Sequence, residues 1–197
     1  MTDGGGQRLS RRAVVTGISA AGVGALAGCL GDEDVPDPVA LDGADQLCDN
    51  CNMVVSQHRG PKAQAFYLDD APTDTIADRE DGVAWFCSSW CGYSFVFEWE
   101  DRGHDPAGMY GTDYSAVEYE LVGDGPATLI SEHPEPEAFV EMDELTLVVD
   151  SDVQGAMGSS LIGFSGADDA DAFVAEHGGD RFEHDDVTAE LIAALGT

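Results

Sequence analysis

The feature that most constrains this chain is the placement of cysteine and methionine in three short motifs. The first runs from Cys48 to Met53 as Cys-Asp-Asn-Cys-Asn-Met, and the second contains Cys87 and Cys91. The third is Gly155-Ala156-Met157-Gly158. Thiolate and thioether sulfur atoms are soft ligands, and Cu(I) is the metal ion that they select best. The motifs therefore predict a soft-metal site whose candidate ligands are Cys48, Cys51, Met53, Cys87, Cys91 and Met157.

Other interpretations of the four cysteines remain open on spacing alone. Four thiols outside the cytoplasm commonly pair as two disulfides, and the same four thiols are a zinc ligand set. Neither alternative needs a thioether, so Met53 and Met157 favour copper. Glycines flank Met157 on both sides, which is unusual for a methionine that fills a core. The two other methionines beyond the leader, Met109 and Met142, are predicted to serve in packing.

Histidines and catalytic motifs add little to this pattern. His58 lies near the first sulfur motif and is a candidate borderline ligand, whereas the other four histidines have no metal-binding spacing. The sequence contains no nucleophile elbow, phosphate loop or dinucleotide fingerprint, so no enzyme activity is predicted. The rival enzyme hypothesis is a thiol–disulfide oxidoreductase that uses Cys48 and Cys51. Such motifs normally begin a helix, whereas the residues after Met53 favour a strand.

The first 29 residues are predicted to be an export signal rather than part of the fold. Ser10-Arg11-Arg12 resembles a twin-arginine motif, and the small and apolar run that follows is shorter than the roughly 20 residues of a membrane span. This run ends in Leu26-Ala27-Gly28-Cys29, which resembles a lipobox with Cys29 as the acylated residue. The alternative is an ordinary signal peptide, with Cys29 incidental. Residues 30–44 are predicted to be an acidic tether, so the protein is expected on the outer face of the cytoplasmic membrane.

The net charge of −31 argues against one class of partner. Binding to nucleic acid depends on lysine and arginine side chains that neutralise phosphates, and this chain has only 8 such residues against 39 acidic ones. We therefore expect no nucleic-acid partner. The acidic residues are spread along the whole sequence, which is typical of a solvated shell suited to high salt. A halophilic source is predicted.

The remaining sequence predicts an α+β fold of two related strand-strand-helix halves, residues 45–104 and 105–197. In the first half, strands are expected at 62–68 and 83–87, followed by a helix that Ser88 caps and Gly103 ends. In the second half, strands are expected at 145–149 and 160–164, followed by a helix at 168–177. A last helix, capped by Asp185 or Asp186, is expected to reach Leu195.

These pieces together resemble the NosL-type accessory proteins of nitrous oxide reductase, which are lipid-anchored copper chaperones. The resemblance covers most of residues 45–190 and rests on the lipobox, Cys48-x-x-Cys51-x-Met53, Gly60-Pro61-Lys62-Ala63-Gln64, Phe86-Cys87-Ser88, Thr112-Asp113-Tyr114, Gly155-x-Met157-Gly158 and His177-Gly178-Gly179. It implies Cu(I) binding, delivery of copper to nitrous oxide reductase and its maturation machinery, and halves similar to part of organomercurial lyases. Zn(II) is expected as a second or competing ion.

The chain departs from the family pattern at several positions. Asn52 stands where the family often has glycine, and Ala156 and Gly163 stand where it often has proline. The Cys87-x-x-x-Cys91 spacing is more similar to the metal-binding TRASH motif. These departures affect the identity of the partner more than the expectation of soft-metal binding.

Overall fold

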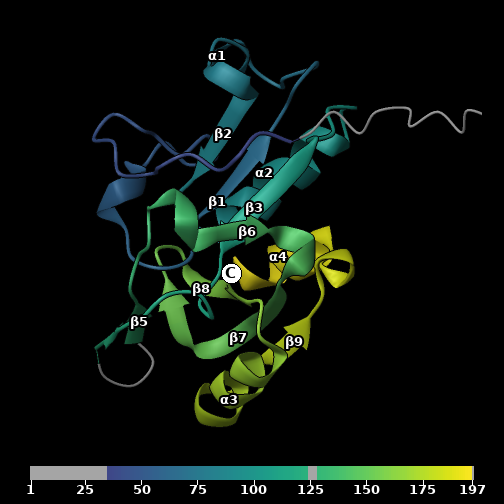
Figure 1. Ribbon diagram of the computed structural model, residues 1–197. Coiled ribbons are helices and arrows are strands. Elements are labelled where there is room, and N and C mark those ends of the chain that lie inside the picture. Colours follow the sequence, from purple (N-terminus) through teal and green to yellow (C-terminus); the bar gives the residue numbers. More distant parts are fainter. Residues whose placement is uncertain (1–34, 124–127, 197) are drawn as a thin grey trace, which may run out of the picture. The chain divides into compact units, whose positions relative to one another are not determined.

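The computed structural model describes residues 35–123 and 128–196 (Figure 1). The predicted leader, with Cys29, lies outside the described residues. The α+β class is confirmed, since the chain builds two sheets with helices packed on them. The first sheet is fully antiparallel and has the order β2-β1-β3-β6. Its strands are β1 (Ala63–Phe66), β2 (Val83–Phe86), β3 (Gly108–Thr112) and β6 (Phe139–Glu141).

The second sheet is built around a long hairpin. Strand β7 (Thr146–Gly155) pairs antiparallel with β8 (Gly158–Phe164), and their register brings Gly155 opposite Gly158 at the tip. Strand β9 (Asp180–Phe182) also pairs antiparallel with β7, whereas β5 (Thr128–Ile130) pairs parallel with it. Strand β4 (Leu121–Val122) completes the sheet at the edge of β5.

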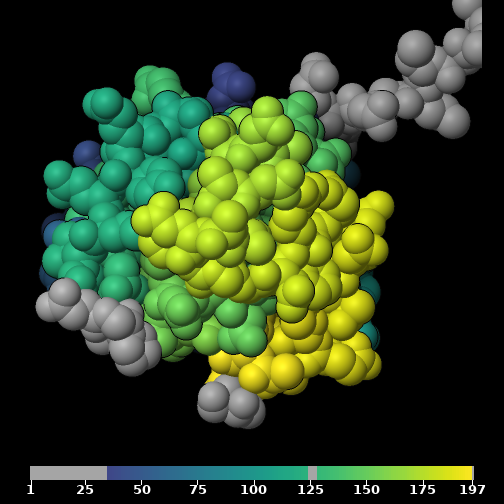
Figure 2. Space-filling model, turned by 90° about the horizontal axis from the view of Figure 1, so that it is seen from below, coloured from purple at the N-terminus to yellow at the C-terminus, as the bar shows by residue number. Residues whose placement is uncertain are grey.

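Four α-helices and five short 3₁₀ turns complete the described residues. Helix α2 (Ser89–Glu100) packs against β1, β2 and α4 (Ala189–Leu195), and α3 (Ala167–His177) packs against β7, β8 and β9. Seen from below, the C-terminal residues, in yellow-green and yellow, form a large part of the visible face (Figure 2). The remaining elements are α1 (Asp74–Ala77), η1 (Val55–Gln57), η2 (Glu80–Gly82), η4 (Pro136–Ala138), η5 (Met142–Glu144) and η6 (His184–Asp186).

The predicted strands and helices are present at nearly the predicted positions. One prediction about the last helix was wrong, because Asp185 and Asp186 lie in the 3₁₀ turn η6 instead of capping α4. The cap is Thr188, whose side chain accepts a hydrogen bond from the amide of Leu191. Strands β3, β4, β5, β6 and β9 were not predicted, since each is short and lacks a run of alternating apolar residues.

A buried carboxylate joins the two sheets at the ends of β3 and β8. Asp113 forms an isolated parallel bridge with Gly163, and its carboxylate accepts hydrogen bonds from the amides of Ser115 and Ser165 and from the Ser165 hydroxyl. The largest core cluster also spans both sheets, from Ala63 and Phe86 to Leu161. The two sheets are therefore packed as one body within the described residues.

The predicted division at residue 104 separates two halves that were expected to be related in structure. Strands β3 and β6, which follow that residue, complete the first sheet by pairing next to β1. The relation between two halves therefore stays a prediction. Among the described residues, no helix is both long and apolar enough to cross a membrane.

Candidate metal centre

The first sulfur motif is a closed loop beside β2, the edge strand of the first sheet. The amide of Cys48 donates to the carbonyl of Met53 at 2.8 Å, and the amide of Asn52 donates to the carbonyl of Cys48 at 2.8 Å. Leu47 and Val54 form an antiparallel bridge at the base of the loop. These bonds fix the backbone that carries the Cys48 and Cys51 side chains before any ligand binds.

The second sulfur motif is a strand-to-helix junction, as predicted. Cys87 directly follows β2, and the hydroxyl of Ser88 accepts the amide hydrogen of Cys91 at 3.0 Å, which caps helix α2. This side-chain cap satisfies one of the free amides in the first helical turn. It also turns the chain so that Cys91 faces back toward Cys87.

The structure brings all four cysteines of the described residues together. Their Sγ atoms lie within 4.8 Å of one another. The Sγ atom of Cys87 lies 3.5 Å from that of Cys51 and 3.7 Å from that of Cys91. Cys48, Cys87 and Cys91 are fully buried, Cys51 is half-buried, and none of the four forms a disulfide. These separations are close to the roughly 3.8 Å between thiolates that share one tetrahedral ion at 2.3 Å.

The thiols influence one another's ionisation. Hydrogen bonds from the thiols of Cys87 and Cys91 stabilise a thiolate on Cys48 and hold its pKa well below the usual value. The same interaction with Cys48, together with burial, raises the pKa of Cys87, and it raises the pKa of Cys91 to about 12. The cluster therefore favours a thiolate on Cys48 that the neighbouring thiols stabilise, and the thiolate is the form of cysteine that binds a soft cation.

An ion pair anchors the first motif to the sheet. The guanidinium of Arg79 donates to both carboxylate oxygens of Asp49, at 2.7 and 3.0 Å, and the amide of Trp85 donates to the same carboxylate at 2.8 Å. The amide of Asp49 donates in return to the carbonyl of Trp85. This contact was not predicted from the sequence. Asp49 lies inside the motif, but nothing in the local sequence identifies Arg79 as its partner.

The two candidate methionine ligands have different environments. Met53 is partly buried and packs against the core cluster that includes Cys48, Cys87 and Cys91. Met157 lies in the two-residue turn of the β7–β8 hairpin and is 37% exposed. Among the described residues, no hydrogen bond or other polar contact joins Met157 to a cysteine, so its role as a ligand stays a prediction.

The hairpin tip is nevertheless held close to the second sulfur motif. Gly60 adopts φ +103°, and a side chain there would come within 2.5 Å of the Cα atom of Gly155. The next residue, Pro61, accepts the amide hydrogen of Ser89 at 3.0 Å. Ser89 also donates its hydroxyl to the carbonyl of Leu161 in β8, at 2.6 Å. The turn that carries Met157 is thus tied through two short segments to the junction between Cys87 and Cys91.

His58 lies two residues before Gly60, in the segment that contacts the hairpin tip. Among the described residues, the potential ligand atoms that lie within 4.8 Å of one another belong to the four cysteines, and His58 is not in this group. Its backbone carbonyl accepts a hydrogen bond from the Nζ atom of Lys62 at 2.6 Å. His58 as a ligand therefore also stays a prediction.

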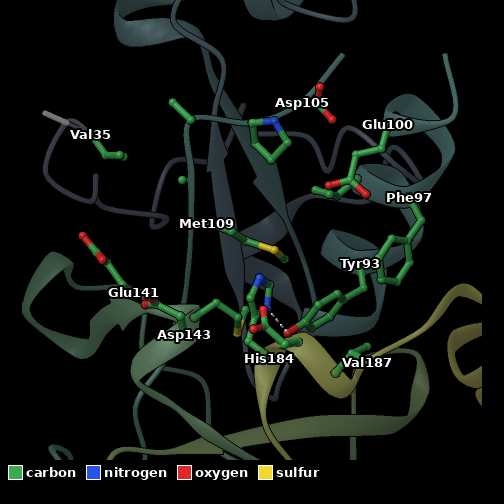
Figure 3. A pocket seen from close by; sticks show the side chains of 16 residues that line it. Val35, Tyr93, Phe97, Glu100, Asp105, Met109, Glu141, Asp143, His184 and Val187 are labelled. Atoms are coloured by element: carbon green, nitrogen blue, oxygen red, sulfur yellow. Dashed lines mark hydrogen bonds between the residues drawn. The ribbon is translucent and has the colours of Figure 1, made fainter. Parts of the chain in front are cut away.

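A separate cavity of about 490 Å³ opens between α2, β3 and the turns η5 and η6 (Figure 3). Tyr93 and Met109 contribute to its apolar wall, and the Tyr93 hydroxyl contacts Nδ1 of His184 at 2.8 Å. Carboxylates such as Glu100 and Asp143 lie on its rim (Figure 3). None of the four clustered cysteines is among the described residues that line it. Met109 is 7% exposed, consistent with the predicted packing role.

Comparison with known proteins agrees with the sulfur motifs. The sequence model of the NosL family matches residues 38–192, which include all four clustered cysteines. The chain belongs to the NosL family. It is 30% identical over 170 residues to the copper-binding lipoprotein NosL of Stutzerimonas stutzeri, and the match covers 85% of this chain and 76% of that protein.

The fold is also that of a solved NosL structure. The crystal structure of the copper chaperone NosL from Shewanella denitrificans superposes with a TM-score of 0.61, covering 79% of this chain and 98% of that one. The sequence identity of 24% makes this a statement about fold alone.

One departure from the NosL pattern has a local explanation. Asn52, where the family often has glycine, adopts φ +61° in the left-handed region. Glycine reaches this region without strain, and asparagine is among the few other residues that tolerate it. The loop that positions Cys48 and Met53 is therefore preserved despite the substitution.

Proposed function

We propose that this protein is a Cu(I)-binding metallochaperone that delivers copper for the assembly of nitrous oxide reductase during denitrification. The observation that carries this proposal is the convergence of four sulfur atoms within 4.8 Å in a chain of the NosL family. The similar proteins are named for copper binding and chaperone activity, and neither name describes a catalysed reaction. A non-catalytic role therefore fits both the site and the relatives.

The proposed ligand set is the four cysteines together with Met53 and Met157, and His58 is an additional candidate. Cu(I) is stable with two or three soft ligands, so the whole set need not bind at once. A chaperone must also release its ion. A neutral thioether suits release better than another thiolate because it holds the cation less strongly.

A structural zinc site is the second candidate function, and one observation favours it. The Sγ–Sγ separations of 3.5 and 3.7 Å match a tetrahedral site of four thiolates. The two hypotheses differ in the number of thiols that must lose a proton. Zinc in such a site requires four thiolates, whereas Cu(I) needs only two.

The oxidoreductase hypothesis finds less support in the local backbone. Thiol–disulfide oxidoreductases use the first turn of a helix to stabilise the attacking thiolate. Here Cys48 and Cys51 flank a turn, and the next described helical element is the three-residue 3₁₀ helix η1. An insulin-reduction assay distinguishes this activity from metal binding.

The decisive experiment is an anaerobic competition titration with a Cu(I) chelator of known affinity. We expect the protein to withdraw about one equivalent of Cu(I) and to bind Zn(II) less tightly than Cu(I) under the same conditions. If the chelator retains all of the copper, the chaperone hypothesis is wrong. A tighter affinity for Zn(II) than for Cu(I) would support the structural zinc site instead.

The location and organisation of the chain belong to the same proposal. Residues 1–29 are a twin-arginine lipoprotein signal, Cys29 carries the lipid, and residues 30–44 tether the protein to the outer face of the cytoplasmic membrane. The rest forms two related halves, residues 45–104 and 105–197. The even distribution of acidic residues supports a halophilic source. The proposed partners are nitrous oxide reductase and its maturation machinery.

A further inference from the structure

The chain contains one lysine, Lys62, and this residue is fully buried. Lysine is almost never fully buried unless its charge is paired, because removing an ammonium group from water costs several kcal/mol. All other basic residues of the chain, apart from histidines, are arginines. A protein with 39 acidic residues thus keeps its single lysine in the interior. This location calls for a buried anionic partner.

The strand register places Lys62 beside the sulfur cluster. Ala63 pairs with Phe86 across β1 and β2, so one further step of the antiparallel register brings Lys62 opposite Cys87. Residues in directly opposite positions project from the same face of a sheet, with Cβ atoms about 5 Å apart. The backbone is fixed at this point, because the amide of Lys62 donates to the hydroxyl of Thr112 at 3.0 Å.

The segment that leads into the first sulfur motif contacts both this face and the edge of the sheet. Gln64, two residues after Lys62, exchanges two hydrogen bonds with the backbone of Val39. Trp85, two residues before Cys87, exchanges backbone and side-chain hydrogen bonds with Asp49. Val39 therefore lies over the side of the sheet from which the Gln64 side chain projects, and Asp49 lies along the outer edge of β2 next to Trp85.

The surroundings of the Lys62 amine contain few groups that can neutralise it. Its Nζ atom donates to the carbonyl of His58 at 2.6 Å, which is a neutral partner. Burial lowers the pKa of Lys62 to about 8, and the negative charge that Cys87 and Cys48 share in the sulfur cluster, together with that of Glu132, opposes this fall. Glu132 is shared with Arg59, whose guanidinium lies 3.9 Å from it. Because the Oε2 atom of Glu132 is itself buried without a hydrogen-bond partner among the described residues, Glu132 and the thiolate of the sulfur cluster are the two described anions that the Lys62 charge can balance.

The charge of the loaded site explains why such a cation is useful. A Cu(I) ion held by two thiolates has a net charge of −1, and thioether ligands leave that charge unchanged. Inside a protein this charge costs free energy unless an opposite charge lies nearby. One ammonium group balances one bis-thiolate Cu(I) unit.

We propose that Lys62 is the counter-charge of the sulfur site and sets its affinity for Cu(I) by neutralising the anionic bis-thiolate complex. This inference rests on the proposed copper-binding function. It assigns to Lys62 an electrostatic role through the ligands, without direct contact with the ion. It also predicts that the ammonium group favours the thiolate state of the empty site.

The test uses three substitutions that separate charge from hydrogen bonding. Lys62→Gln removes the charge and keeps a donor for the His58 carbonyl, Lys62→Met removes both, and Lys62→Arg keeps the charge. Arg181→Gln, at an exposed ion pair with Asp171, controls for the change in net charge. Two quantities are measured for each full-length protein. These are the Cu(I) affinity by chelator competition and, without metal, the pH at which thiolate absorbance near 240 nm appears.

We expect both neutral variants to bind Cu(I) about ten- to a hundredfold more weakly and to form thiolate at higher pH, whereas Lys62→Arg and Arg181→Gln remain close to the wild type. Equal affinity and equal thiolate titration in folded Lys62→Gln and wild-type proteins would overturn the proposal. The proposal would also be overturned if Lys62→Gln kept the wild-type Cu(I) affinity while Lys62→Arg lost it. Hydrogen bonding to His58 would then explain the effect.

A second measurement covers the case in which the neutral variants do not fold. Because the chain has one lysine, ¹³C labelling of lysine gives a single side-chain signal whose titration follows Lys62 directly. We expect its pKa to fall when Cys48→Ser removes the thiolate, and an unchanged pKa would contradict the proposed pairing. Failure of the wild-type protein to bind Cu(I) would count against the proposed function, while the two titrations of the metal-free protein still test the Lys62 pairing.

Discussion

The guanidinium of Arg79 donates two hydrogen bonds to the Asp49 carboxylate and lies 3.7 Å from the centre of the Trp85 ring. Asp49 is the residue between Cys48 and the rest of its loop, so this contact holds the first sulfur motif against β2. Both side chains are mostly buried, which strengthens the pair relative to an exposed one. Two of the metal-binding candidates, Cys48 and Cys51, are therefore positioned by a residue outside all three motifs.

We expect Arg79→Met to destabilise the protein by about 1–3 kcal/mol, because it leaves a partly buried carboxylate without its charged partner. The free energy of unfolding from urea titration measures this change. Arg102→Met is a matched control, since Arg102 pairs with Glu98 at an exposed i,i+4 position and should contribute less than about 0.5 kcal/mol. Similar losses in the two variants would show that the Asp49 contact has no special role.

Met157→Leu tests the third sulfur motif. Met157 is at an exposed hairpin turn, so this substitution of similar volume should leave the melting temperature nearly unchanged. If the thioether binds copper, the Cu(I) affinity should fall by about tenfold or more, or about 1.4 kcal/mol. Chelator competition measures the affinity and calorimetry the stability.

Met142→Leu provides the opposite control for Met157. Met142 is 1% exposed, and its sulfur packs close to Gly111 in β3. The change should cost up to about 1.5 kcal/mol of stability and leave copper binding intact. An unchanged Cu(I) affinity in folded Met157→Leu would remove Met157 from the ligand set and leave the cysteines as the site.

Cys29→Ser tests the proposed lipid anchor. Loss of the acylated sulfur should move the protein from the membrane fraction to the soluble extracytoplasmic fraction, because the acidic tether is repelled by an anionic bilayer. Immunoblotting of the two fractions measures the distribution. If the variant remains in the membrane fraction, an uncleaved leader provides the anchor.

Oxidation should compete with metal binding at the sulfur cluster. The Sγ atoms of Cys51 and Cys91 lie 3.5 and 3.7 Å from that of Cys87, so small side-chain movements suffice for a disulfide. We expect metal-free protein exposed to air to lose two or four titratable thiols, together with Cu(I) binding, and to recover both with a reductant. Prior loading with Cu(I) should protect the thiols. Complete persistence of free thiols in air would argue against this competition.

Burial of Lys62 predicts a specific dependence of stability on pH. Its pKa is about 8 in the folded protein and has an ordinary value of 10.5. Between these values the unfolded chain holds a proton that the folded protein has released, so the contribution of Lys62 to stability increases as the pH rises. The stability difference between wild type and Lys62→Met should therefore rise between pH 8 and 10.5, by no more than about 3 kcal/mol. A flat difference would contradict the lowered pKa.

The elements that the sequence predicted correctly are those with a strong local signal. Ser88 caps α2 as predicted, and the α3 helix begins and ends within one residue of its predicted bounds. Strand β3 was missed because it contains two glycines and owes its place to pairing with β1. Asp185 and Asp186 were wrongly predicted as caps, since Thr188 is an equally good local candidate that lies nearer the helix.

The composition of the candidate site and the convergence of its cysteines were predictable, but the contacts that position them were not. Sulfur motifs can be read from residue spacing, and the convergence of the cysteines was expected. The contact between Arg79 and Asp49 and the position of Lys62 opposite Cys87 depend on strand register, which local sequence does not specify. The one lysine in the chain was the available signal for Lys62.

The uneven burial of the four cysteines gives the site an entrance. Cys48, Cys87 and Cys91 are closed off by the core, and Cys51 alone is half-buried. An incoming donor from another protein should therefore reach the ion from the Cys51 side and replace that thiolate first. Transfer by such stepwise ligand substitution would need no unfolding, and its rate would depend on how well the receiving protein fits the rim around this single cysteine.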